Sequence, residues 1–160
     1  MSTNPFNAVE LKKQNTLEII RLIEDINVRD EYGATLLHSA IAYENTPIGL
    51  DLIKKGIDVN AKTKKGLTPL HFCTIYQNVE LMRAILNNGG DTSITDNSGN
   101  TPLLNAVGEP KRTYEFLNLL AKFCKPEIAF QKNNSGISPL ELAKRMGDNE
   151  AVAIITSNFL

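Results

Sequence analysis

The sequence predicts an all-α fold in which antiparallel helix pairs stack into a solenoid, and three observations support this. A six-residue motif occurs four times, and its glycines stand 33, 33 and 37 residues apart. A period of this length is typical of stacked repeats rather than of one globular core. Three copies contain Thr-Pro or Ser-Pro, which is typical of a helix start. Loops of two or three residues join the helices predicted in the first two repeats, so these helices must run antiparallel.

Each position of the motif has a physical role. The four copies read GATLLH, GLTPLH, GNTPLL and GISPLE. The glycine suits a turn with a positive φ, and the Thr or Ser hydroxyl can accept a backbone N–H of the first helical turn. The leucine is the first apolar residue of the helix. Three positions later stands a small residue, which lets neighbouring helices approach closely: Ala40, Cys73, Ala106 and Ala143.

With these residues the chain resembles the ankyrin repeats, whose 33-residue units read roughly D-x-x-G-x-T-P-L-H-x-A-A. The resemblance covers residues 28–160 and implies that the loops before each motif project as hairpin fingers. Fingers 1 to 4 are residues 25–33, 58–66, 91–99 and 127–136. The chain keeps the leading Asp of the pattern as Asp30 and Asp96 and departs from the pattern at Leu36 (for Pro), Leu104 and Glu141 (for His), and Thr63 and Asn133 (for Asp). We expect these departures to weaken single loops and to leave the fold unchanged.

Residues 1–27 read as an N-terminal cap that has lost the motif. Residues 15–26 have apolar residues at helical spacing, and residues 8–14 supply a more polar first helix, as a terminal repeat exposed to water requires. The end of this cap keeps the phase of the repeats, because Asp25, Asp58 and Asp91 follow one another at intervals of 33 residues.

Four repeats follow the cap, and together we expect one domain over residues 1–160. The first two repeats, 28–60 and 61–93, predict helices near residues 36–43, 47–55, 69–77 and 79–87. The third repeat, 94–128, is irregular, because residues 108–112 lengthen the loop between its helices and residues 124–127 replace the usual glycine exit. The last repeat, 129–160, is a C-terminal cap that closes the stack with a helix over residues 150–155.

The composition narrows the classes of partner and the compartment. The 160 residues are 42% hydrophobic and 22% charged, and the net charge of −1 argues against a protein that holds a phosphate backbone. No apolar stretch reaches about 18 residues, and the first residues lack the pattern of a secretory signal. We therefore expect a cytoplasmic protein with no membrane or nucleic-acid partner. Two cysteines, Cys73 and Cys124, do not predict a disulfide framework.

Catalytic patterns are missing from the sequence. It contains no recognisable nucleophile with a base, no carboxylate pair, no metal-ligand spacing and no phosphate-binding loop. The two histidines, His38 and His71, both end a motif, where the ankyrin resemblance implies a structural role in hydrogen bonding within and between fingers. We expect no enzyme activity, no cofactor and no metal.

The ankyrin resemblance also implies where a partner would bind, namely the finger tips and the exposed face of the first helices. The residues placed on this surface are Glu31, Tyr32, Ala34, Ala42, Tyr43, Lys64, Lys65, Leu67, Ile75, Tyr76, Asn97, Ser98, Asn100, Glu109, Asn134, Ser135, Ile137 and Arg145.

The strongest candidates for binding a partner are Tyr32, Tyr43, Lys64, Lys65, Ile75, Tyr76, Asn97 and Glu109. Tyr43 and Tyr76 occupy equivalent places in adjacent repeats, and tyrosine is enriched at binding hot spots. The alternative is that both rings cover helix junctions. Residues 62–65 form a lysine-rich finger tip that would steer an acidic partner, or that is simply solvated.

The favoured function is a non-catalytic protein-binding module that is a monomer on its own. Small free-standing ankyrin proteins are often bacterial, and some serve as immunity proteins that occlude a toxin. Two alternatives stay open: an enzyme with an unrecognised site, or a fragment of a scaffold or host-directed effector.

Overall fold

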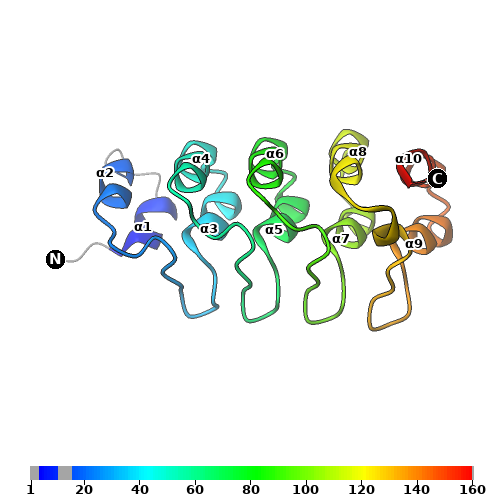
Figure 1. Ribbon diagram of the computed structural model, residues 1–160, viewed down its shortest axis with the longest axis horizontal. Coiled ribbons are helices and arrows are strands. Elements are labelled where there is room, and N and C mark those ends of the chain that lie inside the picture. Colours follow the sequence, from blue (N-terminus) through cyan, green and yellow to red (C-terminus); the bar gives the residue numbers. More distant parts are fainter. Residues whose placement is uncertain (1–3, 11–15, 160) are drawn as a thin grey trace. The chain divides into compact units, whose positions relative to one another are not determined.

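The computed structural model describes residues 4–10 and 16–159, and its regular elements there are helices (Figure 1). An isolated antiparallel bridge between Arg29 and Thr35 is recorded at the base of finger 1. The chain divides into two compact units, Met1–Gly90 and Asp91–Leu160. The all-α prediction is confirmed.

Unit 1 consists of helix pairs that stack in the order of the sequence. Its elements are α1 (Pro5–Glu10), α2 (Thr16–Arg21), α3 (Leu36–Ala42), α4 (Thr46–Lys54), α5 (Pro69–Tyr76) and α6 (Val79–Asn87). The first helices of successive pairs contact one another, α1 with α3 and α3 with α5, and α4 contacts α6. These bounds agree with the helices predicted for the first two repeats.

Unit 2 repeats this arrangement. Its elements are α7 (Pro102–Gly108), α8 (Tyr114–Phe123), the 3-10 helix η1 (Pro126–Phe130), α9 (Pro139–Arg145) and α10 (Asn149–Phe159). Helix α7 packs on α9, and α8 packs on α10. The predicted long loop between α7 and α8 is present, whereas the short helix η1 was not predicted. It begins at Pro126, which suits the first position of a helix, and it buries Ile128 and Ala129.

The N-terminal cap differs from the prediction at both of its helices. Helix α1 begins at Pro5 rather than near residue 8, because the side chain of Asn4 accepts the Phe6 N–H at 2.9 Å. Residues 11–14 of that prediction, and residue 15 of the next, lie outside the described residues. Helix α2 ends at Arg21 rather than near residue 26, because the chain turns into finger 1, where Asp25 Oδ1 accepts the Asn27 N–H at 2.9 Å.

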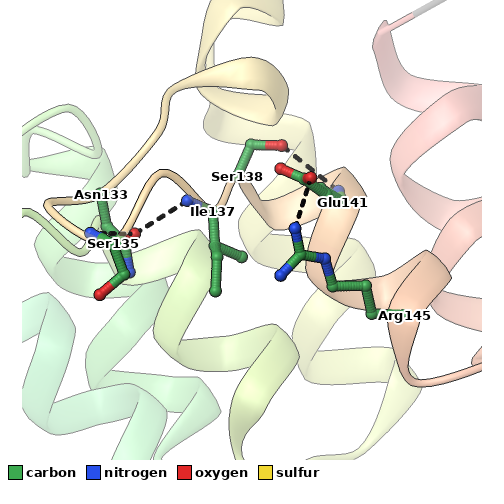
Figure 2. A network of polar contacts seen from close by, with 6 residues as sticks. All are labelled: Asn133, Ser135, Ile137, Ser138, Glu141 and Arg145. Atoms are coloured by element: carbon green, nitrogen blue, oxygen red, sulfur yellow. Dashed lines mark hydrogen bonds and ion pairs between the residues drawn. The ribbon is translucent and has the colours of Figure 1, made fainter.

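The same side-chain hydrogen bonds close the finger turns. Asp30 Oδ1 accepts the N–H groups of Tyr32 and Ala34, both at 2.8 Å, and Asp96 does the same for Ser98 and Asn100. Asn133 preserves this pattern with the N–H groups of Ser135 and Ile137, both at 3.0 Å (Figure 2). Thr63 Oγ1 is recorded with one such bond, from the Leu67 N–H at 3.2 Å.

The core of each unit lies along the motif residues. The motif leucines are all buried, and Leu70 is 1% exposed. The small residues predicted to let helices approach are also buried: Ala40, Cys73, Ala106 and Ala143. The four motif glycines have φ between 74° and 79°, as the turn into each helix requires. In the last repeat, Ser138 Oγ accepts the Glu141 N–H and so starts α9 (Figure 2).

Candidate protein-binding site

A groove lies between fingers 1 and 2 and the first helices of their repeats. It has a volume of ≈ 380 Å³, and we call it the aromatic groove because its lining includes Tyr32, Tyr43 and Phe72. Small side chains, among them Ala34 and Ala42, also line it. The two fingers are held side by side by a hydrogen bond from the Lys64 N–H to the Tyr32 carbonyl at 2.9 Å. The groove therefore lies on a paired, hydrogen-bonded backbone.

The aromatic rings are open to solvent to different degrees. Tyr32, at the tip of finger 1, is 68% exposed, and Tyr43, at the end of α3, is 42% exposed. Phe72 is half-buried, and its ring meets His38 edge-on with the ring centroids 4.8 Å apart. The exposed rings of Tyr32 and Tyr43, with the half-buried ring of Phe72, offer apolar surface to a partner.

Lysines of finger 2 add positive charge to the groove. Lys64 and Lys65 line it and are exposed. Lys62 is also exposed, and its carbonyl accepts a hydrogen bond from Arg29 at 2.7 Å. Asp30 is the acidic residue in the lining, and its Oδ1 atom already accepts two N–H groups of its own loop.

His38 lines the groove and joins the two repeats that form it. Its Nδ1 atom accepts the Thr35 N–H at 3.1 Å, so the proton is on Nε2, which donates to the Leu67 carbonyl at 3.2 Å. Burial lowers the pKa of His38 to about 4, although the hydrogen bond that His38 donates to the Leu67 carbonyl acts to raise it. The imidazole is therefore neutral at pH 7. His38 thus forms hydrogen bonds within its own repeat and to the next one, through residues that follow fingers 1 and 2. His71 likewise accepts the Thr68 N–H at 3.1 Å.

The sequence-predicted site residues divide into three groups. Tyr32, Tyr43, Lys64 and Lys65 come together in the aromatic groove. Ile75 and Tyr76 are exposed on α5, and the ring of Tyr76 adjoins that of Phe72 at 6.1 Å between centroids.

Asn97 and Glu109 form the third group and belong to unit 2. The Asn97 carbonyl accepts the Asn134 side-chain amide at 3.1 Å. Glu109 Oε1 accepts the Lys111 N–H at 3.2 Å within the long loop. Arg145, another residue predicted to lie on the binding surface, is ion-paired with Glu141 at 2.8 Å (Figure 2). The pKa of Glu141 is lowered, chiefly by the hydrogen bond from Arg145.

Sequence reasoning did not place five of the lining residues on the binding surface: Asp30, His38, Ser39, Thr63 and Phe72. The largest apolar one is Phe72. It follows the motif histidine directly, where the repeat before it has Ser39, and Ser39 also lines the groove. The two residues hold the same phase in adjacent repeats, but neither residue type marks this position as surface.

Over residues 4–10 and 16–159, no cluster of three or more His, Cys, Asp and Glu side chains could hold a metal ion. Both cysteines are free thiols, and burial raises the pKa of Cys124 to about 12 and that of Cys73 further. These thiols are protonated at neutral pH, which is the unreactive form.

None of the helices in the described part of the chain is long and apolar enough to cross a membrane.

The comparisons with known proteins agree with the repeat pattern. The model of the family described as ankyrin repeats (many copies) matches residues 21–73 and 52–103, which together span more than half of the chain. The chain belongs to the ankyrin repeat family. No curated protein was found to match it significantly. Ankyrin repeats generally mediate protein–protein interaction and are typically scaffolds without enzyme activity.

Proposed function

We propose that this ankyrin repeat protein is a non-catalytic module that binds a partner protein through the aromatic groove and the adjoining face of α5. The supporting observation is the pair of exposed rings at equivalent positions of adjacent repeats, Tyr43 and Tyr76. Phe72 lines the groove together with Tyr43, and its ring adjoins that of Tyr76. Tyrosine offers a large, stiff apolar ring with a polar tip, and it is enriched where binding energy concentrates.

The test is a binding measurement with the native partner, recovered from the source cells by affinity capture and then purified. The double variant Tyr43→Ala with Tyr76→Ala should weaken binding by well over roughly tenfold, because truncating a hot-spot residue typically costs about 2 kcal/mol or more. Circular dichroism should show that the variant stays folded, because both rings are partly exposed.

The control is Lys54→Ala on α4, which lies outside the groove lining and should leave affinity unchanged. A double tyrosine variant that binds as tightly as the parent would refute the proposal. The next candidate would then be the loop around Arg112 in unit 2, over residues 108–112.

In a more specific form of this proposal, the chain is an immunity protein that resides in the cytoplasm and neutralises a toxin. It requires a partner that loses its activity in a stoichiometric complex. The protonated free thiols of Cys73 and Cys124 are compatible with a reducing compartment. A toxin gene beside this one in the genome would support this form, and a metabolic operon would favour an enzyme instead.

A further inference from the structure

We propose that the partner presents an acidic segment that inserts one large apolar side chain into the aromatic groove and places carboxylates against Lys64 and Lys65. This inference rests on the proposed function and specifies the chemistry of the partner.

The apolar half of the argument comes from the shape of the lining. Three rings, Tyr32, Tyr43 and Phe72, line the groove together with the alanines at positions 34 and 42. Small residues beside large rings leave room for a side chain from outside, and an aromatic side chain in this place would also gain favourable ring contacts. The volume of ≈ 380 Å³ is near the lower end for ligand pockets, which fits one side chain and its neighbours.

The exposure of the rim favours a protein segment over an enclosed small molecule. Tyr32 is 68% exposed, so a ligand confined to the floor would leave most of this ring in water. The apolar surface also continues along α5, where Ile75 and Tyr76 are 44% and 41% exposed. A chain that crosses the rim covers both regions.

The acidic half of the argument comes from the charge at the groove. Lys64 and Lys65 line the groove and are exposed, and Asp30 is the acidic residue of the lining. Asp30 is half-buried and its Oδ1 atom accepts the N–H groups of Tyr32 and Ala34, so its charge is partly compensated inside the loop. Glu31 and Glu44 are exposed nearby in sequence but do not line the groove.

Arg29 and Lys62 extend the positive charge along the paired fingers. Arg29 donates to the carbonyls of Gly33 and Lys62, at 3.1 Å and 2.7 Å, which ties the bases of the two fingers together. A surface of one sign raises the association rate with a partner of the opposite sign and disfavours partners of the same sign. An acidic segment is therefore the complement of this surface.

The experiment selects peptides from a random library displayed on phage, with the full chain as bait. The enriched peptides are synthesised with a fluorescent label, and their affinities are measured by fluorescence polarisation. We expect enrichment of peptides that carry an aromatic residue or leucine flanked by Asp and Glu. Tyr43→Ala should weaken their binding by roughly tenfold or more, as for a hot spot.

Two variants with equal changes in net charge test whether the groove selects acidic peptides. Lys64→Glu with Lys65→Glu should weaken binding of the acidic peptides by roughly tenfold or more and should select basic peptides instead. Lys54→Glu with Arg83→Glu changes the net charge equally at two exposed positions of α4 and α6, outside the groove lining. This control should bind the acidic peptides as the parent does.

Three results would overturn the inference: no peptide is enriched, the enriched peptides carry no excess of acidic residues, or the two charge variants bind them equally. The proposed function is judged separately with the native partner. If Tyr43→Ala with Tyr76→Ala abolishes that binding while reversal at Lys64 and Lys65 leaves it unchanged, the function stands and this inference fails.

Discussion

His38 is buried without charge and spans two repeats, so it makes the stability of unit 1 depend on pH. Its pKa falls from 6.5 to about 4 on folding, chiefly because burial disfavours the imidazolium ion. The unfolded chain therefore binds this proton at higher pH than the folded chain does. The stabilisation is complete above pH 6.5 and is lost as the pH falls through the range from 6.5 to 4, by about 3 kcal/mol in all.

The measurement is urea unfolding at several pH values between 7.5 and 4.5. His38→Leu is the matched variant, because Leu104 stands at the equivalent position of the third repeat. It should lower the free energy of unfolding at pH 7.5, because the Thr35 N–H and the Leu67 carbonyl lose a partner. Its stability should also change less with pH than that of the parent. Equal pH slopes in both proteins would contradict the role assigned to His38.

The roles of the motif residues were predictable from the sequence, because each role depends on a property of the residue type. The motif glycines need a positive φ, the leucines seed the core, and Thr or Ser caps a helix, so each role follows from the residue type and its phase. Asn133 shows the limit of this reasoning. Because it replaces Asp, Asn133 was expected to weaken finger 4. Its amide oxygen nevertheless accepts two N–H groups at the positions that correspond to those bonded by Asp30 in finger 1.

The candidate site was less predictable, because most of its residues, its three large rings among them, lie outside the motif. Tyr43 and Tyr32 could be placed by phase, and the structure brings both to one groove. Phe72 could not be recognised from its type alone, since a phenylalanine on a helix reads as core. Only the pairing of the two fingers shows that its ring lines a groove.

Gly99 and Gly136 hold the same motif position in two repeats. Alanine substitutions at the two glycines separate the free-energy cost of backbone strain from the cost of crowding between fingers. Gly99 and Gly136 have φ of 79° and 74°, so alanine is strained at both. A Cβ at Gly99 would lie 2.6 Å from Asn134 Oδ1 and 2.9 Å from the Asn134 nitrogen, whereas a Cβ at Gly136 would meet no atom within 4 Å. Finger 3 is therefore crowded by finger 4 at this point.

Gly136→Ala should cost about 1–2 kcal/mol from the left-handed backbone alone. Gly99→Ala should cost at least about 1 kcal/mol more, because the finger 4 backbone must move. Chemical denaturation of both variants measures the difference. If the two substitutions destabilise the protein equally, the close approach of the two fingers has no energetic weight.

The long loop between α7 and α8 is anchored by an ion pair that is largely shielded from water. Arg112 pairs with Asp148, and both side chains are only 9% exposed. Tyr114 donates its hydroxyl to Asp148 Oδ1 at 3.1 Å, and the guanidinium group of Arg112 lies over the Tyr114 ring at 5.7 Å. Asp148 Oδ1 also accepts the Ala151 N–H and so caps α10. The extra loop residues thus tie the third repeat to the helix that follows α9.

Arg112→Ala should cost about 1.5–3 kcal/mol, because it removes a charged hydrogen-bond partner from the largely shielded carboxylate of Asp148. Arg112→Ala with Asp148→Asn should be more stable than the single variant, because asparagine is neutral and still caps α10. Thermal or urea unfolding compares them. A double variant that is no more stable than Arg112→Ala would show that the charge of Asp148 is not the source of the loss.

At the scale of the whole molecule, we propose that the two units unfold as one domain. The second repeat covers residues 61–93 and the family match continues over residues 52–103, so both cross the boundary between Gly90 and Asp91. Repeats bury their apolar faces against their neighbours, and stability in such arrays couples adjacent repeats. A repeat that crosses the boundary therefore predicts coupled unfolding.

Leu70 in unit 1 and Leu103 in unit 2 hold the same motif position, and substitutions at these two leucines provide the test. Leu70 and Leu103 are 1% and 0% exposed, and replacing either by alanine should cost about 2–5 kcal/mol. Hydrogen exchange followed by mass spectrometry, at urea concentrations near the midpoint, reports peptides of both units separately. If the units are coupled, Leu103→Ala should speed exchange in α5 and α6 as well as in α7 and α8, and Leu70→Ala should do the converse. Acceleration confined to the unit that carries the substitution would show that the chain folds as two independent domains.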